Sequence, residues 1–164
     1  MIALTPWAEE DLPLLMSLNA PEMTAHLGGP ESEEQVLRRH RHYVDDAALP
    51  VVRIFKILLD SALVPVGQVC YWERPWRDEL VWESGWGVLP EFQGQGIAAR
   101  AVGLLVGKAR SERLHRCLHA FPSVANAASN ALCRKLGFTC IEECDFEYPP
   151  GHITCCNDWR LELW

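Results

Sequence analysis

The chain has 164 residues, a formal net charge of −7 and 49% hydrophobic residues. This length suits one core, so we expect residues 1–164 to form a single domain. The negative charge disfavours a nucleic acid as the main partner and is compatible with a cationic amine substrate. No run approaches the roughly 18 apolar residues that span a membrane. The N-terminus lacks the basic and apolar regions of a signal peptide, and we expect a cytoplasmic protein that does not bind membranes.

Hydrophobic periodicity and turn residues divide the first half of the chain into two helices and four strands. Ser32-x-x-Gln35 is a capping box that opens the second helix. Asp60-Ser61-Ala62-Leu63 predicts a hairpin turn between two β-rich runs, and Glu73 to Asp78 is typical of a polar turn. The expected elements are a strand over 2–4, a helix over 9–19, a helix from 32 to about 46, and strands over 51–59, 64–72 and 79–88.

The stretch from Leu89 to Ala98 lies between a strand signal and a helix signal, and it contains Gly94 and Gly96. Glycines allow positive φ and let backbone N–H groups turn inward around an anion. The following helix adds its unpaired N–H groups and the positive end of its dipole. This stretch therefore predicts a phosphate or pyrophosphate site. Taken alone, the spacing Gly94-x-Gly96-x-x-Ala99 also fits a dinucleotide-binding fingerprint.

The second half of the chain alternates helices and strands. Asn126 is a candidate cap for a short helix, and Gly137 follows that helix at the position that favours glycine. The segment Pro149-Pro150-Gly151 predicts a turn between the last two strands. The expected elements are a helix over 97–113, a strand over 114–121, a helix over 127–136, and strands over 138–148 and 153–163.

Seven cysteines, an odd number, are scattered without the CxxC spacing of zinc sites. The only clusters are Cys140 with Cys144 and the adjacent pair Cys155 and Cys156. We therefore expect reduced, mostly buried thiols and no bound metal.

Two motifs carry a family resemblance. Gln93-x-x-Gly96-x-Ala98 resembles the acyl-CoA-binding motif of the GNAT acetyltransferase superfamily. The run from Asn126 to Phe138, with Ser129, Leu132 and Lys135-Leu136-Gly137 between, resembles a second motif of that family. The N-terminal segment, with Pro6-Trp7 and His26 to Pro30, looks like the branch that includes ribosomal-protein N-terminal acetyltransferases.

The order of the expected elements is also similar to the GNAT fold over nearly the whole chain. The resemblance implies an α+β fold in α/β/α layers, with a mixed, mostly antiparallel sheet of about seven strands and about four helices. A dinucleotide-binding domain fits less well, because an acid should end the strand after the glycine loop. That strand reads Leu118-His119-Ala120-Phe121 and holds no acid, and only about 65 residues follow the loop.

The resemblance implies acetyl-CoA as cosubstrate. Val88 and Leu89 would present backbone groups to the pantetheine arm beside a splay in the sheet, and a backbone N–H near Val88 would stabilise the oxyanion. The Gln93 side chain either contacts the cofactor or stabilises the turn. Asn126 would contact pantetheine or acceptor while capping its helix, and Ser129 faces either the cofactor or solvent. The pyrophosphate would bind the backbone N–H groups of Gln93, Gly94, Gln95, Gly96, Ile97 and Ala98.

Acetyl transfer to an amine needs a proton acceptor, a stabilised oxyanion and a proton for the departing thiolate. Glu83 is the leading base, since the apolar neighbours Trp82, Trp86 and Val88 would raise its pKa toward neutrality. The alternative is an ordinary exposed strand glutamate. Many relatives have a tyrosine as general acid where this chain has Cys133. If Cys133 only packs, Ser129 or water would protonate the thiolate.

The acceptor implied by the resemblance is a small-molecule amine or a peptide N-terminus. Trp86, His152 and Asp158 are candidate acceptor contacts, and the segments 74–78, 148–152 and 157–159 are candidate parts of the acceptor site. Direct transfer in a ternary complex is favoured, because no Cys–His or Ser–His arrangement marks a covalent enzyme. The rival hypothesis is a non-catalytic acyl-CoA-binding sensor, which gains if Glu83 points away from the cleft. Either a monomer or a homodimer is compatible with the sequence.

Overall fold

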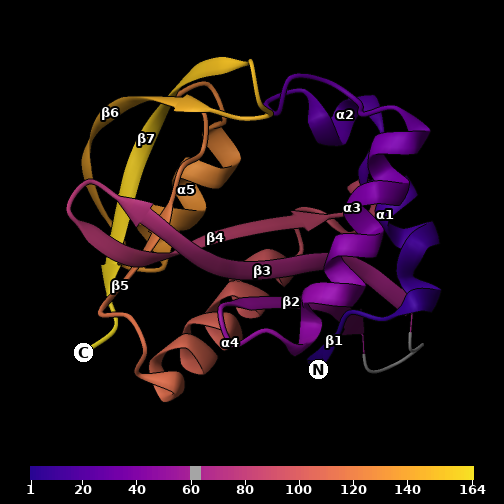
Figure 1. The fold of residues 1–164 in the computed structure, drawn as a ribbon, viewed down its shortest axis with the longest axis horizontal. Coiled ribbons are helices and arrows are strands. Elements are labelled where there is room, and N and C mark those ends of the chain that lie inside the picture. Colours follow the sequence, from indigo (N-terminus) through magenta and orange to yellow (C-terminus); the bar gives the residue numbers. More distant parts are fainter. Residues whose placement is uncertain (60–63) are drawn as a thin grey trace.

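A computed structural model describes residues 1–59 and 64–164, so the predicted turn at 60–63 lies outside the described residues. Seven strands form one sheet in the order β1-β2-β3-β4-β5-β7-β6 (Figure 1). Among the strands of the described residues only β4 and β5 pair in parallel, so the predicted mixed, mostly antiparallel sheet is confirmed. The strands are β1 (Ile2–Pro6), β2 (Val52–Leu59), β3 (Val64–Trp76), β4 (Glu79–Val88), β5 (Cys117–Ala120), β6 (Thr139–Glu147) and β7 (Ile153–Glu162).

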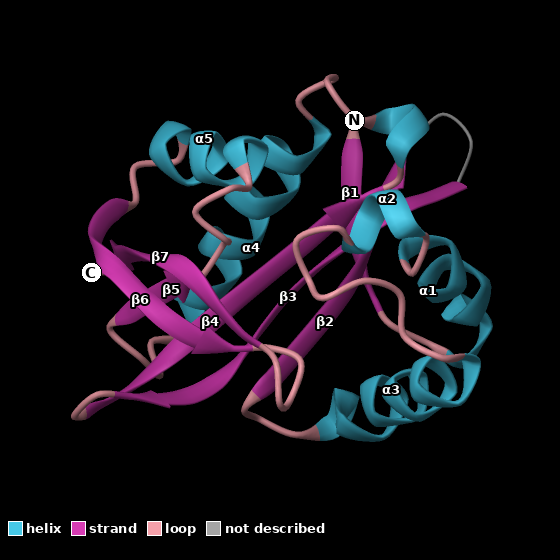
Figure 2. Ribbon diagram, turned by 90° about the horizontal axis from the view of Figure 1, so that it is seen from above, coloured by secondary structure: helices cyan, strands magenta, loops and turns pink. Residues whose placement is uncertain are grey.

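Helices cover both faces of the sheet. Figure 2 shows α4 and α5 on one face and α1, α2 and α3 on the other. The α4 face of the core includes Leu105 and Tyr71, both fully buried, and the opposite face includes Leu15 and Val36. Each such side chain contributes about 1.5–3 kcal/mol when fully buried. The helices are α1 (Leu12–Leu18), α2 (Pro21–Thr24), α3 (Glu33–Asp45), α4 (Ile97–Glu112) and α5 (Ala127–Lys135).

The N-terminal helix and β3 differ from the sequence predictions. Residues Glu9–Asp11 form a 3₁₀ turn before α1, which places Pro13 in the first turn of the helix, where its missing N–H costs nothing. The short helix α2 was not predicted. The predicted polar turn at 73–78 is wrong, because β3 continues to Trp76 and pairs there with Glu79 of β4. The turn itself is only Arg77-Asp78, and Arg77 has a φ of 56°.

The fifth strand is shorter than predicted, and its shortness opens the sheet. Arg113 adopts a left-handed conformation after α4, so β5 begins at Cys117 rather than at residue 114. Its parallel pairing with β4 covers only Trp82 with Leu118 and Glu83 with His119. Pro122 cannot donate to a ladder, which helps to end the strand. Beyond Glu83 the two strands diverge, as the resemblance implied.

All seven cysteines are free thiols, and four of them, Cys70, Cys117, Cys133 and Cys156, are buried. Within residues 1–59 and 64–164 no cluster of three potential metal ligands occurs. In the same described part of the chain, no helix is both long and apolar enough to cross a bilayer.

Candidate active site

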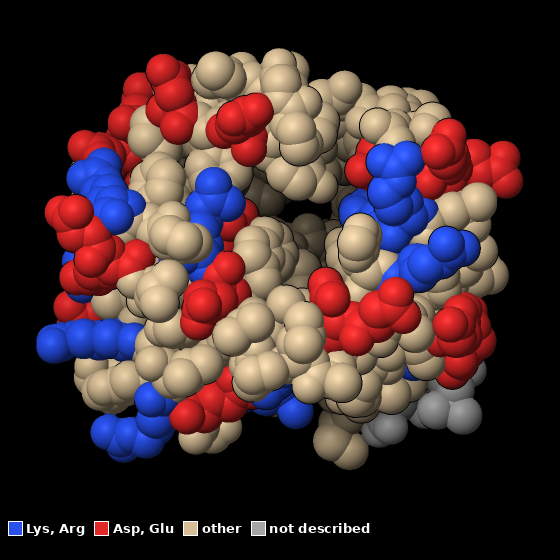
Figure 3. All heavy atoms as spheres, viewed as in Figure 1, with Lys and Arg blue, Asp and Glu red and all other residues tan. Residues whose placement is uncertain are grey.

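A cleft lies where β4 and β5 diverge, and Figure 3 shows the hollow in the middle of this face of the molecule. Its lining includes Ser84, Gly85 and Trp86 of β4, and Asn126 and Ser129 at the start of α5. Side chains from α2, α3, β3, β6 and β7 complete the wall. The cleft therefore reaches from the opened sheet edge to the helices and the hairpin that face each other above it.

The exposed backbone edge of β4 points into the divergence. The N–H of Leu89 donates to the carbonyl of Val66 on β3 at 2.8 Å. Because hydrogen bonding alternates along antiparallel strands, Val88 and Trp86 then direct their backbone groups away from β3. The Gln93 side chain donates from Nε2 to the Val88 carbonyl at 2.8 Å. This arrangement leaves the N–H groups of Trp86 and Val88 facing the cleft side, while the Leu89 N–H is engaged elsewhere.

The glycine loop has the backbone geometry that the sequence predicts. Gly94 and Gly96 both have φ of 73°, and a Cβ at either would meet no atom within 4 Å. Glycine is therefore required here for its backbone angle and not for lack of space. Gly96 caps the 16-residue helix α4, and Ile97 is buried as the first helical residue. The N-terminus of α4 is therefore preceded by a loop with open backbone, and this arrangement is suited to binding an anion.

The start of α5 is fixed beside the cleft by two asparagines. Asn126 Oδ1 accepts a hydrogen bond from the Ser129 N–H at 3.1 Å, which confirms the predicted cap. Buried Asn130 donates to the carbonyl of Ser123 at 2.9 Å and accepts from Trp159 Nε1 at 2.8 Å. Sequence analysis missed Asn130, for which the available signal was a polar residue on the inward face of a helix. Cofactor contacts of Asn126 and Ser129 stay predictions.

Glu83 lies in the wall of the cleft with only 7% of its surface exposed. Its Oε2 accepts hydrogen bonds from Trp72 Nε1 at 3.1 Å and from Arg74 Nη1 at 2.7 Å. Its other oxygen has no hydrogen-bond partner among the described residues. Burial raises the pKa of Glu83, and the neighbouring Arg74 opposes that shift.

The neighbours of Glu83 differ from those expected. Trp82 and Val88 lie on the opposite face of β4 because side chains alternate along a strand. Trp82 is fully buried against Tyr71, at a ring separation of 4.8 Å. Trp86 has the same position in this alternation as Trp82 and Val88. It nevertheless lines the cleft, because it lies beyond the point where β4 and β5 diverge. Trp82 and Val88 therefore lie on the side of β4 away from the Glu83 carboxyl, whose pKa burial raises.

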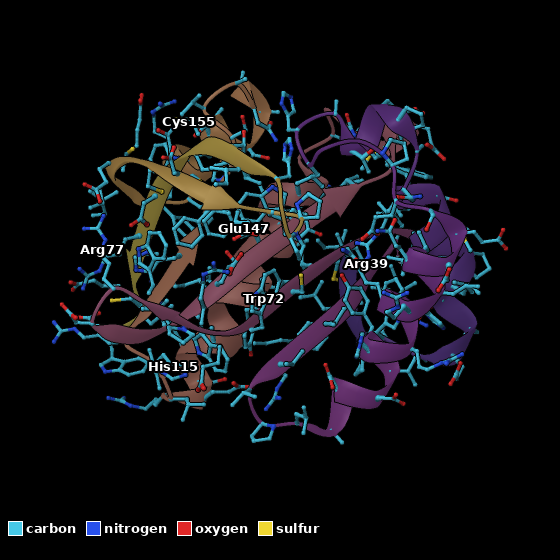
Figure 4. The ribbon with its side chains drawn as sticks, turned by 45° about the horizontal axis from the view of Figure 1, so that its top comes forward. Arg39, Trp72, Arg77, His115, Glu147 and Cys155 are labelled. Atoms are coloured by element: carbon cyan, nitrogen blue, oxygen red, sulfur yellow. The ribbon has the colours of Figure 1, made fainter. Side chains whose placement is uncertain are left out.

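Arg74 is held against Glu83 by aromatic rings. Its guanidinium carbon lies 4.4 Å from the ring centre of Phe146 and 5.9 Å from those of Phe121 and Trp76. Such cation–π contacts hold the side chain in one place. Figure 4 shows Trp72, the second partner of Glu83, on β3 near the centre of the molecule, with Arg39 on α3 beside the same region.

Asp158 is not placed for the predicted contact with an acceptor. It is 1% exposed and does not line the cleft. Its Oδ1 lies 2.6 Å from His119 Nδ1, and its Oδ2 accepts from Trp76 Nε1 at 2.9 Å. Burial alone would raise the pKa of the Asp158 carboxyl, but these two hydrogen bonds lower it below its usual value. Asp158 therefore anchors the aromatic cluster around Arg74.

The remaining candidates divide into those inside and outside the cleft. His152 is exposed in the β6–β7 turn, where it approaches Gly28 and does not line the cleft. Tyr148, in the same predicted segment, does line it, as does Tyr43 of α3. Cys133 is fully buried away from the cleft, and burial raises the pKa of its thiol to about 12. A buried thiol with a raised pKa releases its proton less readily, which favours a packing role for Cys133 over proton donation.

Comparison of the sequence with curated proteins finds no match. Solved structures show the same fold at low identity. The acetyltransferase of Salmonella typhimurium that modifies the N-terminal serine of ribosomal protein L7/L12 superposes with a TM-score of 0.81 at 20% identity, over 98% of this chain and 94% of that one. The spermidine N-acetyltransferase of Vibrio cholerae, in complex with CoA and spermine, gives a TM-score of 0.81 at 16% identity, over 99% of this chain and 95% of that chain.

An aminoglycoside acetyltransferase in complex with coenzyme A gives a TM-score of 0.79 at 17% identity, over 99% of this chain and 95% of that chain. The sequence itself matches the family model of the acetyltransferase (GNAT) domain over residues 2–139, which is most of its length. This match agrees with the glycine loop before α4 and with the divergence of β4 and β5. The chain belongs to the GNAT acetyltransferase family.

Proposed function

We propose that this protein transfers an acetyl group from acetyl-CoA to a primary amine by direct attack in a ternary complex. The observation that carries the proposal is one cleft that joins the divergence of β4 and β5 to a buried carboxylate, Glu83. The glycine loop at the start of α4 would bind the pyrophosphate through its backbone N–H groups. Family membership supports acetyl-CoA as the cosubstrate.

In this proposal each step has a residue of the chain beside it. The amine nitrogen attacks the thioester carbon, and Glu83 accepts the amine proton through its unpartnered oxygen or one water. The N–H of Val88 stabilises the oxyanion, since the divergence of the strands leaves it without a partner on β5. When the C–S bond breaks, the thiolate takes a proton from Ser129 or from a water beside it. The products are the N-acetyl amine and CoA with a free thiol.

The position of Glu83 favours an enzyme over a CoA-binding sensor. A sensor needs no proton acceptor, whereas Glu83 lines the cleft and keeps one oxygen free of hydrogen bonds within the described residues. Arg74 and Trp72 hold the carboxylate through its other oxygen, which fixes its orientation without occupying both acceptors. That arrangement suits a general base that must be ready before the acceptor binds.

Structurally similar proteins act on several kinds of amine, which supports an amine as the acceptor here. Those proteins acetylate the N-terminal serine of a ribosomal protein, bind spermine, or are named for aminoglycosides. We include both a small-molecule amine and a peptide N-terminus in the proposal. We further propose that residues 1–164 act as one domain, as a monomer or homodimer in the cytoplasm, where seven unpaired thiols would stay reduced.

Ligand-induced stabilisation is expected with CoA and not with NAD. A ligand present at 100 times its dissociation constant stabilises the folded state by about 2.7 kcal/mol, which raises the melting temperature measurably. Thermal-shift assays with CoA, acetyl-CoA and NAD at equal concentrations check this expectation. Stabilisation by NAD alone would contradict the assignment of the glycine loop to CoA.

A further inference from the structure

The acceptor side of the cleft is rich in aromatic side chains. Six of them come from six separate parts of the fold: α3, β3, β4, the segment after β5, β6, and the turn between β6 and β7. Aromatic side chains bury large apolar areas and favour an apolar or aromatic body in a ligand. These residues are Tyr43, Trp72, Trp86, Phe121, Phe146 and Tyr148.

Charged side chains in the same wall are few and already paired. Among the described residues that line the cleft, Glu83 is the only carboxylate and Arg39 the only arginine or lysine. Arg74 lies 2.7 Å from Glu83, and Glu31 lies 2.5 Å from Arg39. Asp158 does not line the cleft and is paired with His119. An acceptor with several ammonium groups would therefore find no second carboxylate in the cleft.

Two of the aromatic rings in the wall, those of Phe121 and Phe146, already contact a cation. A cation can bind the face of an aromatic ring, but Arg74 already lies 4.4 Å from the ring centre of Phe146 and 5.9 Å from that of Phe121. A second cation beside Arg74 would meet a like charge. Moving a multiply charged ligand from water into this wall would cost desolvation energy without compensating ion pairs.

We propose that the acceptor carries a single amine on an apolar or aromatic body, and that polyamines and other polycations are poor substrates. The inference rests on the proposed acetyl transfer and specifies its substrate class. The single amine would reach Glu83, and the apolar body would lie against the aromatic wall. A free arylalkylamine and a peptide with an aromatic N-terminal residue share this chemistry.

The test is a comparison of acceptors at fixed, saturating acetyl-CoA. Phenethylamine, a phenylalanyl peptide amide and spermidine are compared by kcat/KM, with product identity established by mass spectrometry. At least one of the two aromatic monoamines is expected to exceed spermidine by roughly tenfold or more, the scale on which apolar pockets discriminate. The relative rates of the two monoamines separate a free amine from a peptide. Equal or better use of spermidine would overturn the proposal while leaving acetyl transfer established.

A charge introduced into the wall provides a second test. Thr154 of β7 lines the cleft and is half-buried. Thr154→Asp adds an unpaired carboxylate, whereas Thr154→Asn adds the same shape without charge. The ratio of kcat/KM for spermidine to that for the monoamine should rise several-fold in Thr154→Asp relative to Thr154→Asn. An unchanged ratio in two variants that still bind CoA would contradict the charge argument. Failure of every acceptor in the wild-type protein would overturn the acetyl transfer on which the inference rests.

Discussion

Replacement of Glu83 by glutamine is expected to lower kcat by about 10²-fold or more near pH 7, because loss of a general base typically costs 10²- to 10⁴-fold. Glutamine keeps the shape of the side chain and can still accept the hydrogen bonds from Trp72 and Arg74. It cannot accept the amine proton. CoA affinity should change little, because the glycine loop does not include Glu83 and none of its residues lines the cleft that Glu83 lines. Steady-state kinetics and a CoA titration of the same preparation check both expectations.

The pH profile adds a second signature for Glu83. Burial raises the pKa of its carboxyl, so the wild-type rate should fall as the pH drops through that raised value and the base becomes protonated. The glutamine variant should lose this acid limb and recover part of its rate at high pH, where more of the acceptor is unprotonated. Glu79→Gln, an exposed position on the same strand, is the matched control and should behave as wild type. A decrease of less than about threefold in Glu83→Gln would remove Glu83 from the role of base.

Replacement of Gly96 by glutamate is expected to abolish CoA binding while the fold survives. Gly96 has a φ of 73°, a conformation that costs other residues roughly 1–2 kcal/mol, and open space surrounds the position that a Cβ would take. The new side chain would place a negative charge at the N-terminus of α4, against the pyrophosphate. Isothermal titration with CoA measures the loss, and circular dichroism monitors the fold.

Two further substitutions separate charge from strain at the glycine loop. Gly107→Glu introduces the same residue at an exposed position within α4, where the backbone angle is ordinary, and should leave CoA binding intact. Asparagine adopts the left-handed conformation more readily than glutamate and adds no charge. The Gly96→Asn variant should therefore bind CoA more tightly than the Gly96→Glu variant. Wild-type CoA affinity in a folded Gly96→Glu protein would show that the phosphates bind elsewhere.

Local sequence signals predicted most of the fold and the glycine loop. Two-residue alternation and 3.6-residue periodicity depend on neighbours in the sequence, as do the caps at Ser32 and Asn126, and the structure confirms both caps. The positive φ angles at Gly94 and Gly96 likewise follow from the absence of side chains. These features required no knowledge of how distant segments meet.

The surroundings of Glu83 depend on distant segments and could not be predicted in the same way. The sequence predicts a polar turn around Arg74, but antiparallel pairing extends β3 past it and brings its side chain to Phe146 of β6. Asp158 accepts a hydrogen bond from Trp76, which is 82 residues away in the sequence, because β7 lies between β5 and β6 in the sheet. Its pairing with His119 follows from the same strand order. Sheet order was thus the missing information for Arg74 and Asp158.

Acetyl transfer itself is the central claim, and thiol release from acetyl-CoA in the presence of amine acceptors tests it most directly. The assay follows free CoA thiol over time and identifies the acetylated amine by mass spectrometry, with acceptor-free and Glu83→Gln reactions as controls. We expect one acetylated amine for each thiol released, at a rate that depends on both acceptor and enzyme. Tight CoA binding without an acetylated product from any acceptor would contradict the account and identify the protein as a CoA-binding sensor.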